Sequence, residues 1–236
     1  MTEPGASGDE PADPGSNKES AVKTADRPGQ RAFYRFAHAV VCGAVAIPHR
    51  VIVEGAEKLP PSGAYILCPS HRSMLDIPVI AFVTTRRIRF FGKTELWKYA
   101  PLGWVFDTLG GIPVERGTSD RRSISMSLAA LAGGEPLCIF PEGTRRNGPV
   151  VDDVFEGAAY IALKAGVPLV PVGIGGTERV ARATRLYRPG RVAVVVGDPI
   201  VTPNPSVKRD VVDAVTEQLH VEIQRCFDEA QRLAGA

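Results

Sequence analysis

The sequence predicts an α/β fold, a single domain in which helices flank a largely parallel central sheet. Two patterns indicate this fold. Short apolar runs alternate with longer segments of helical periodicity, which is typical of strands joined by crossover helices. Runs such as RVAVVVG (191–197) are apolar throughout, as expected for strands of a sheet covered on both faces. The length of 236 residues suits one hydrophobic core.

Individual elements follow from these patterns. The expected strands are AYILC (64–68), IRFFG (88–92), GIPVE (111–115), PLCIF (136–140), PLVPVGI (168–174) and RVAVVVG. The expected helices between them are LDIPVIAFV (75–83), ELWKYAPLGWVFDTLG (95–110), RRSISMSLAALAGG (121–134) and FEGAAYIALKAG (155–166). The last two end in Gly, as helices often do. A long amphipathic helix is expected after Val207, because apolar residues recur there every three or four positions.

Composition narrows the classes of function. The chain is 44% hydrophobic and 23% charged, which is typical of a globular protein with a substantial core. Its net charge is +2, a basic excess that suits phosphate groups or a membrane surface but is too weak to indicate nucleic-acid binding. The four Cys form no Cys-x-x-Cys pair, so neither a metal site nor a redox motif is expected, and a reducing cytoplasm fits.

The N-terminal region has two parts. Residues 1–30 are acidic and rich in Pro, Gly and Ser, so we expect a disordered tail, and they lack the order of a secretory signal. Residues 31–50 are expected to form a helix that either packs on the domain or lies in the membrane interface. Their longest uncharged run, Ala39–Pro48, is ten residues, whereas a spanning helix needs about 20. Residues 51–236 are expected to form the functional domain.

The stretch PSHRSMLD (69–76) contains the first candidate catalytic pair, His71 and Asp76. In one regular helix these side chains would point about 140° apart. They can meet if His71 lies in the loop after the strand 64–68 and Asp76 opens the next helix, with Ser70 or Ser73 as the N-cap. Ligands bind at this edge of α/β sheets, and a carboxylate bonded to an imidazole makes it a better base.

Two other readings of this stretch remain. Ser70 or Ser73 would complete a Ser-His-Asp triad, although the chain has no Gly-x-Ser-x-Gly elbow. Alternatively, His71 is structural and caps a helix. Three further stretches help to choose among these readings. GGIPVERG (110–117) offers a guanidinium suited to phosphate, and FPEGTRR (140–146) offers anion-binding donors at a strand end. VPLVPVGIGGTE (167–178) is expected to form an apolar wall.

In this order and spacing, SHRSMLD, GIPVER, FPEGTRR and VPLVPV resemble the four sequence blocks of the glycerolipid acyltransferase family, over about residues 50–200. The resemblance implies an O-acyltransferase of phospholipid biosynthesis, acting at the cytoplasmic side of the membrane as a peripheral protein. Its substrates would be a lysophospholipid and a thioester on coenzyme A or acyl carrier protein, with no cofactor. The product would be phosphatidic acid if the acceptor is 1-acylglycerol-3-phosphate.

The resemblance also implies roles for individual residues. His71 would be the general base and Asp76 its orienting partner, and Lys93, in GKTELW (92–97), would stabilise the thioester oxyanion. The acceptor would be bound by Arg116, Glu142, Gly143, Thr144 and Arg145. Two alternatives stay open: the same chemistry on glycerol-3-phosphate, another lysophospholipid or a glycolipid, and a non-catalytic lipid-binding protein of the same fold.

Overall fold

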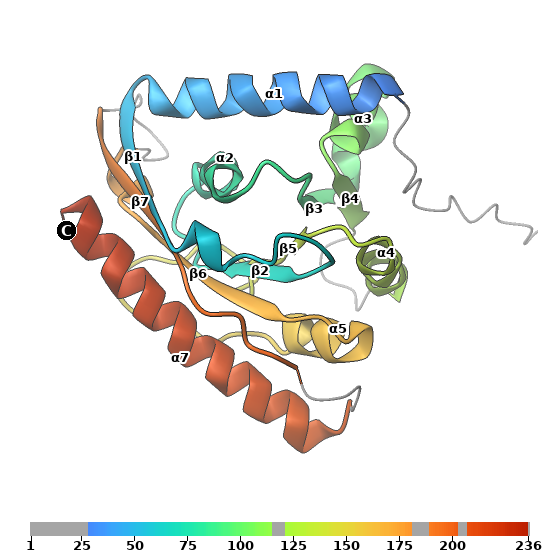
Figure 1. Ribbon diagram of the computed structural model, residues 1–236, viewed down its shortest axis with the longest axis vertical. Coiled ribbons are helices and arrows are strands. Elements are labelled where there is room, and N and C mark those ends of the chain that lie inside the picture. Colours follow the sequence, from blue (N-terminus) through green and yellow to red (C-terminus); the bar gives the residue numbers. More distant parts are fainter. Residues whose placement is uncertain (1–27, 115–120, 181–188, 203–206, 236) are drawn as a thin grey trace, which may run out of the picture.

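A single mixed sheet forms the centre of the molecule. The computed structural model describes residues 28–114, 121–180, 189–202 and 207–235. Within these residues the strand order is β1-β7-β6-β2-β5-β3-β4 (Figure 1). The strands are β1 (His49–Glu54), β2 (Ile66–Pro69), β3 (Arg89–Lys93), β4 (Gly111–Val114), β5 (Leu137–Cys138), β6 (Leu169–Gly175) and β7 (Gly190–Val196). Strands β6, β2, β5, β3 and β4 run parallel to one another, which confirms the predicted α/β fold.

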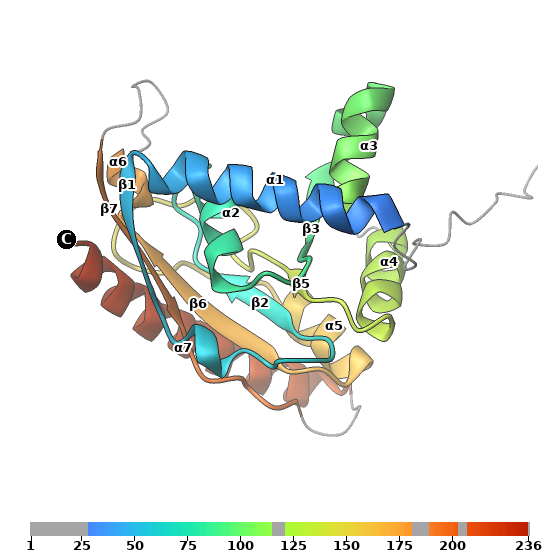
Figure 2. The same ribbon diagram turned by 45° about the horizontal axis from the view of Figure 1, so that its top comes forward.

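The helices cover both faces of this sheet. The α-helices are α1 (Pro28–Ala46), α2 (Asp76–Val79), α3 (Ala100–Thr108), α4 (Arg121–Ala132), α5 (Gly157–Ala165), α6 (Thr177–Val180) and α7 (Arg209–Ala234). Short 3-10 helices are η1 (Ala56–Lys58), η2 (Ile80–Val83) and η3 (Thr94–Lys98). Helices α4, α5 and α7 lie on one face, and α1 and α2 lie on the other (Figures 1 and 2).

Several predicted boundaries differ from those observed. The helix expected over 95–110 is divided into η3 and α3, because Pro101 has no N–H and favours the first turn of a new helix. The helix expected over 31–50 ends at Ala46, before Pro48, and His49 begins a strand that the sequence did not suggest. This strand, β1, pairs parallel with β7, and both run antiparallel to β6.

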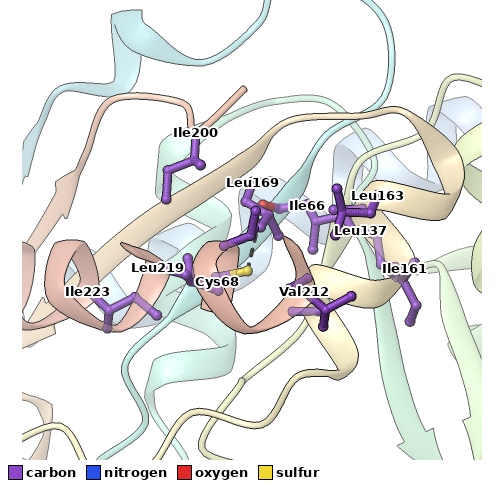
Figure 3. Close-up of a cluster of buried hydrophobic side chains, with 14 of the residues drawn as sticks. Ile66, Cys68, Leu137, Ile161, Leu163, Leu169, Ile200, Val212, Leu219 and Ile223 are labelled. Atoms are coloured by element: carbon purple, nitrogen blue, oxygen red, sulfur yellow. Dashed lines mark hydrogen bonds between the residues drawn. The ribbon is translucent and has the colours of Figure 1, made fainter. Parts of the chain in front are cut away.

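The larger core cluster lies between the sheet and helices α4, α5 and α7. It joins strand residues such as Ile66 and Leu169 to Leu163 of α5 and Leu219 of α7, all fully buried (Figure 3). Helix α7 lies directly on β6, where a Cβ on Gly173 would be 2.0 Å from the carbonyl oxygen of Cys226. A Gly at this position therefore lets the helix and strand backbones touch.

A second cluster fills the opposite face. It joins β-strand residues such as Val172 and Val194 to Val45 of α1 and Val79 of α2. Helix α1 is fixed here by the hydroxyl of Tyr34, which donates to the carbonyl of Arg86 at 3.0 Å. Among the described residues, no helix has the length and apolar character needed to span a membrane.

Candidate active site

Three loops meet at the carboxyl end of the parallel strands. Strand β2 lies between β6 and β5, and His71 follows β2, Glu142 follows β5 and Thr177 follows β6. The carboxyl ends of parallel neighbours lie at one edge of the sheet, so residues that are far apart in the sequence converge there. This edge is where the sequence predicts a ligand site.

His71 and Asp76 are in contact. The imidazole Nδ1 lies 2.9 Å from Asp76 Oδ2. His71 lies in the loop and Asp76 is the first residue of α2, the arrangement expected from helical geometry. Contrary to the prediction from the sequence, neither Ser70 nor Ser73 is the N-cap of α2. Leu75 is the N-cap residue, and the Ser70 hydroxyl accepts the N–H of Ile174.

The hydrogen bonds of Asp76 determine the tautomer of His71. The carboxylate is fully buried and accepts the N–H groups of Arg72 (2.6 Å) and Ser73 (2.7 Å) on Oδ2 and the hydroxyl of Thr177 (2.5 Å) on Oδ1. With these donors in place Asp76 acts as an acceptor, so the proton of the neutral imidazole belongs on Nδ1. His71 Nε2 then carries a lone pair, and the side chain is 13% exposed. This is the geometry of a general base.

Glu142 takes a different position from the residues that follow it. Its side chain is fully buried, and both carboxylate oxygens accept from the Arg72 guanidinium at 2.8 Å. Oε1 also accepts the backbone N–H of His71 at 2.8 Å. Gly143, Thr144 and Arg145, in contrast, are exposed. In FPEGTRR, Glu142 therefore faces the protein interior, whereas the three residues after it are available to a ligand.

Two other predicted residues are described only in part or not at all. Lys93 is the last residue of β3 and pairs with Val114 of β4, so its backbone is at the same edge of the sheet, but its side chain is outside the described part. Arg116 lies outside the described residues. Their predicted roles stay predictions.

An apolar cavity of about 280 Å³ lies on the α1 side of the sheet. Its wall includes Ile77 and Pro78, the two residues after Asp76, so it begins next to the His71 loop. The other lining residues come from α1, η2, β3, η3, α3 and β4 and include Tyr34, His38, Ala81, Phe90, Phe91, Trp97, Phe106 and Gly111. Burial raises the pKa of Tyr34 to about 12, in keeping with this apolar setting. The cavity suits a hydrocarbon chain.

Sequence reasoning missed two residues of the site, Arg72 and Thr177. Arg72 lies within PSHRSMLD (69–76), yet nothing in its sequence position shows that its guanidinium turns away from solvent toward Glu142. Thr177 falls in a stretch expected to form only a wall. Its contact with Asp76 depends on β6 lying beside β2, and the sequence does not reveal this strand order.

The His71–Asp76 pair, the exposed turn at 143–145 and the apolar cavity therefore lie close together on one α/β sheet. A family model described as Acyltransferase matches residues 50–175, more than half of the chain. The chain therefore belongs to the acyltransferase family, and this confirms the resemblance found in its motifs.

Relatives and a solved structure agree with this assignment. A 1-acyl-sn-glycerol-3-phosphate acyltransferase of Chlamydomonas reinhardtii is 33% identical over 66% of this chain and 48% of its own length. One of Bacillus subtilis is 26% identical over 78% of this chain and 91% of its own. The crystal structure of the Thermotoga maritima LPA acyltransferase PlsC superposes with a TM-score of 0.65 and 26% identity, over 85% of this chain and 78% of that one.

The relatives differ in length and in named substrate. This chain spans about half the length of the algal and plant relatives that it matches. A lyso-ornithine lipid O-acyltransferase of Pseudomonas aeruginosa is 33% identical over 55% of this chain and 48% of its own length. Similarity at this level therefore extends across more than one acceptor.

Proposed function

We propose that the protein transfers a fatty acyl group from a thioester, on coenzyme A or acyl carrier protein, to the free hydroxyl of 1-acylglycerol-3-phosphate. The product would be phosphatidic acid, in a step of phospholipid biosynthesis. The observation that carries the proposal is the contact between His71 Nδ1 and buried Asp76, which leaves Nε2 as the basic nitrogen at the edge of the sheet. The names of several relatives support this acceptor.

The transfer would be direct. His71 Nε2 takes the proton of the acceptor hydroxyl as the oxygen attacks the thioester carbonyl, and the buried charge of Asp76 stabilises the resulting imidazolium. The tetrahedral oxyanion collapses, the C–S bond breaks, and the thiolate takes the proton from His71. This sequence yields an ester and a free thiol and requires no acyl-enzyme. The Ser70 hydroxyl is fully buried and occupied by the N–H of Ile174, which favours direct transfer over a serine nucleophile.

Substrate-binding roles follow the same layout. Arg145, Gly143 and Thr144 are exposed beside the His71 loop, so they are suited to bind the acceptor phosphate together with Arg116. Lys93 would stabilise the oxyanion. The acyl chain would occupy the apolar cavity, since its wall begins at the residue that follows Asp76.

A second acceptor class has a specific observation in its favour. The Pseudomonas aeruginosa relative, named for a lyso-ornithine lipid, is as similar to this chain as the algal one, although over a shorter segment. The same base, cavity and thioester chemistry would serve either acceptor. Only the groups that bind the acceptor headgroup would differ.

Purified protein assayed with labelled acyl thioesters and a panel of acceptors tests this proposal. We expect transfer to 1-acylglycerol-3-phosphate and a loss of about 100-fold or more in His71→Ala, because the general base is removed. Near-normal activity in that variant would rule the mechanism out.

Replacing Arg116 should raise the KM for lysophosphatidate. Transfer to lyso-ornithine lipid alone would select the second acceptor, and transfer to no acceptor would favour a lipid-binding protein.

We also propose that α1 places the protein on the cytoplasmic face of the membrane. Its inward side carries Tyr34, His38 and Val41, whereas Phe36 and Val40 on its outer side are 67% and 52% exposed. Ile47, directly after the last residue of α1, is 88% exposed. Positions 36 and 40 lie about 40° apart around a helix, so they share one side of it. An outward apolar stripe on a packed helix, beside exposed arginines at 35 and 50, suits an anionic lipid surface.

A further inference from the structure

Arg72 and Glu142 form a buried ion pair directly behind His71. The side chain of Arg72 is 1% exposed and that of Glu142 is fully buried, and they are joined by two contacts of 2.8 Å. The acceptor-binding turn after Glu142 is exposed, so a substrate bound there would not reach either side chain. The pair must therefore be explained by what it holds within the protein.

The pair and its surroundings fix both backbone groups of His71. The N–H of His71 donates to Glu142 Oε1 at 2.8 Å. Its carbonyl accepts from the N–H of Arg146 at 2.9 Å and from the Arg72 guanidinium at 3.0 Å. The imidazole ring also packs on Phe140, with ring centroids 4.1 Å apart. Together with Asp76, these contacts leave His71 little freedom to rotate.

Arg72 also connects the base to the loop of the acceptor site. Its Nη2 donates to the carbonyl of Val150 at 2.9 Å and its Nε to that of Gly148 at 3.3 Å. The guanidinium lies over the ring of Phe227 in α7, 4.5 Å from its centroid. One side chain thus ties the His71 loop, the loop after Glu142 and the long helix together. All three of its nitrogens donate within the protein and its side chain is 1% exposed, so it is not available to a phosphate.

We propose that Arg72 and Glu142 are positioning residues for the acyl transfer, which together set His71 Nε2 against the acceptor hydroxyl. This role rests on the proposed function, and it differs from the acceptor contact that the family resemblance implies for Glu142. A buried pair of this kind is no stronger a source of stability than apolar side chains. Its use is geometric, because a general base must lie within hydrogen-bond reach of its proton.

A second, partly buried Arg–Glu cluster provides a matched control. Arg89, the first residue of β3, contacts Glu135 at 2.7 Å, and Arg87 contacts the same carboxylate at 2.6 Å. The side chain of Arg89 is 7% exposed, that of Glu135 is 14% exposed and that of Arg87 is 11% exposed. They lie at the amino ends of β3 and β5, the opposite edge from His71. Glu135→Gln disrupts a comparable ion pair without touching the base.

The kinetic test compares Arg72→Met, Arg72→Lys, Glu142→Gln and Glu135→Gln, with circular dichroism to confirm folding. We expect kcat to fall about 100-fold in Arg72→Met and Glu142→Gln, since a displacement of about 1 Å has an effect of that size. The KM for acceptor and thioester should not change. Arg72→Lys should recover part of the loss, and Glu135→Gln should keep wild-type kcat. A raised acceptor KM with normal kcat in Glu142→Gln would overturn the proposal.

A measurement without substrate separates this proposal from the proposed function. The proton on His71 Nδ1, bonded to buried Asp76, should give a downfield NMR signal that is absent in His71→Ala. We expect this signal to exchange rapidly with water in Arg72→Met and Glu142→Gln and to persist in Glu135→Gln. If it persists unchanged in all variants, the pair does not position the ring. A wild-type protein that transfers no acyl group would refute the proposed function while this comparison still decides the role of the pair.

Discussion

The two faces of the sheet are covered in different ways. On one face α7 lies directly on β6, with Gly173 and Gly175 allowing backbone contact, and Leu219 and Phe227 are fully buried. On the other face α1 is held by individual side chains such as Tyr34, and an apolar cavity of about 280 Å³ lies beneath it. The first face is close-packed, whereas the second leaves space for a ligand.

The His71 loop joins these two faces. Arg72 reaches the packed face and lies over Phe227, while Asp76 to Val79 form α2 on the face with the cavity. His71 is therefore anchored through Arg72 to the close-packed side of the protein and lies next to the cavity on the other side. Substitutions on the packed face should lower the free energy of unfolding. Substitutions on the other face should alter substrate choice or membrane binding.

The largest effect is expected on the packed face, for Gly173→Ala. The new Cβ would lie 2.0 Å from the backbone oxygen of Cys226, and neither backbone can yield without moving α7 from the sheet. We expect a loss of about 3 kcal/mol in the free energy of unfolding, measured by urea denaturation. Gly157→Ala, where no atom lies within 4 Å of the new Cβ, is the control. Equal midpoints for both variants would contradict close packing at β6.

The sequence predicted the elements of both faces better than their arrangement. Apolar runs located the strands except β1, whose HRVIVE follows a helix and pairs with a strand about 140 residues later. Local geometry was sufficient to bring His71 and Asp76 together, because they are only five positions apart in the sequence. The contacts of Asp76 with Thr177 and of His71 with Glu142 required knowledge of strand order, which is set by long-range packing that the sequence pattern does not encode.

A smaller effect is expected inside the cavity, for Ala81→Leu. Ala81 lines the cavity from η2, and the added carbons would occupy the space proposed for the acyl chain. We expect kcat/KM for long-chain thioesters to fall by about fourfold for each methylene displaced, about 0.8 kcal/mol each. Short-chain thioesters should be unaffected. Ala129→Leu, on the exposed side of α4, is the control. An equal loss for all chain lengths would show that the chain binds elsewhere.

The smallest effect is expected on the outer side of α1. The double variant Phe36→Ser, Val40→Ser removes exposed apolar groups that make no part of the core, so the free energy of unfolding should not change. Partitioning onto anionic vesicles, measured by flotation, should fall about tenfold, because roughly 1.5 kcal/mol of apolar burial in the lipid is lost. Val221→Ser changes a residue of α7 that is 57% exposed on the packed side of the molecule and should have no effect on flotation. Equal flotation of both variants would mean that the outer side of α1 does not face the bilayer. The exposed side chains of Phe36 and Val40 would then need another partner.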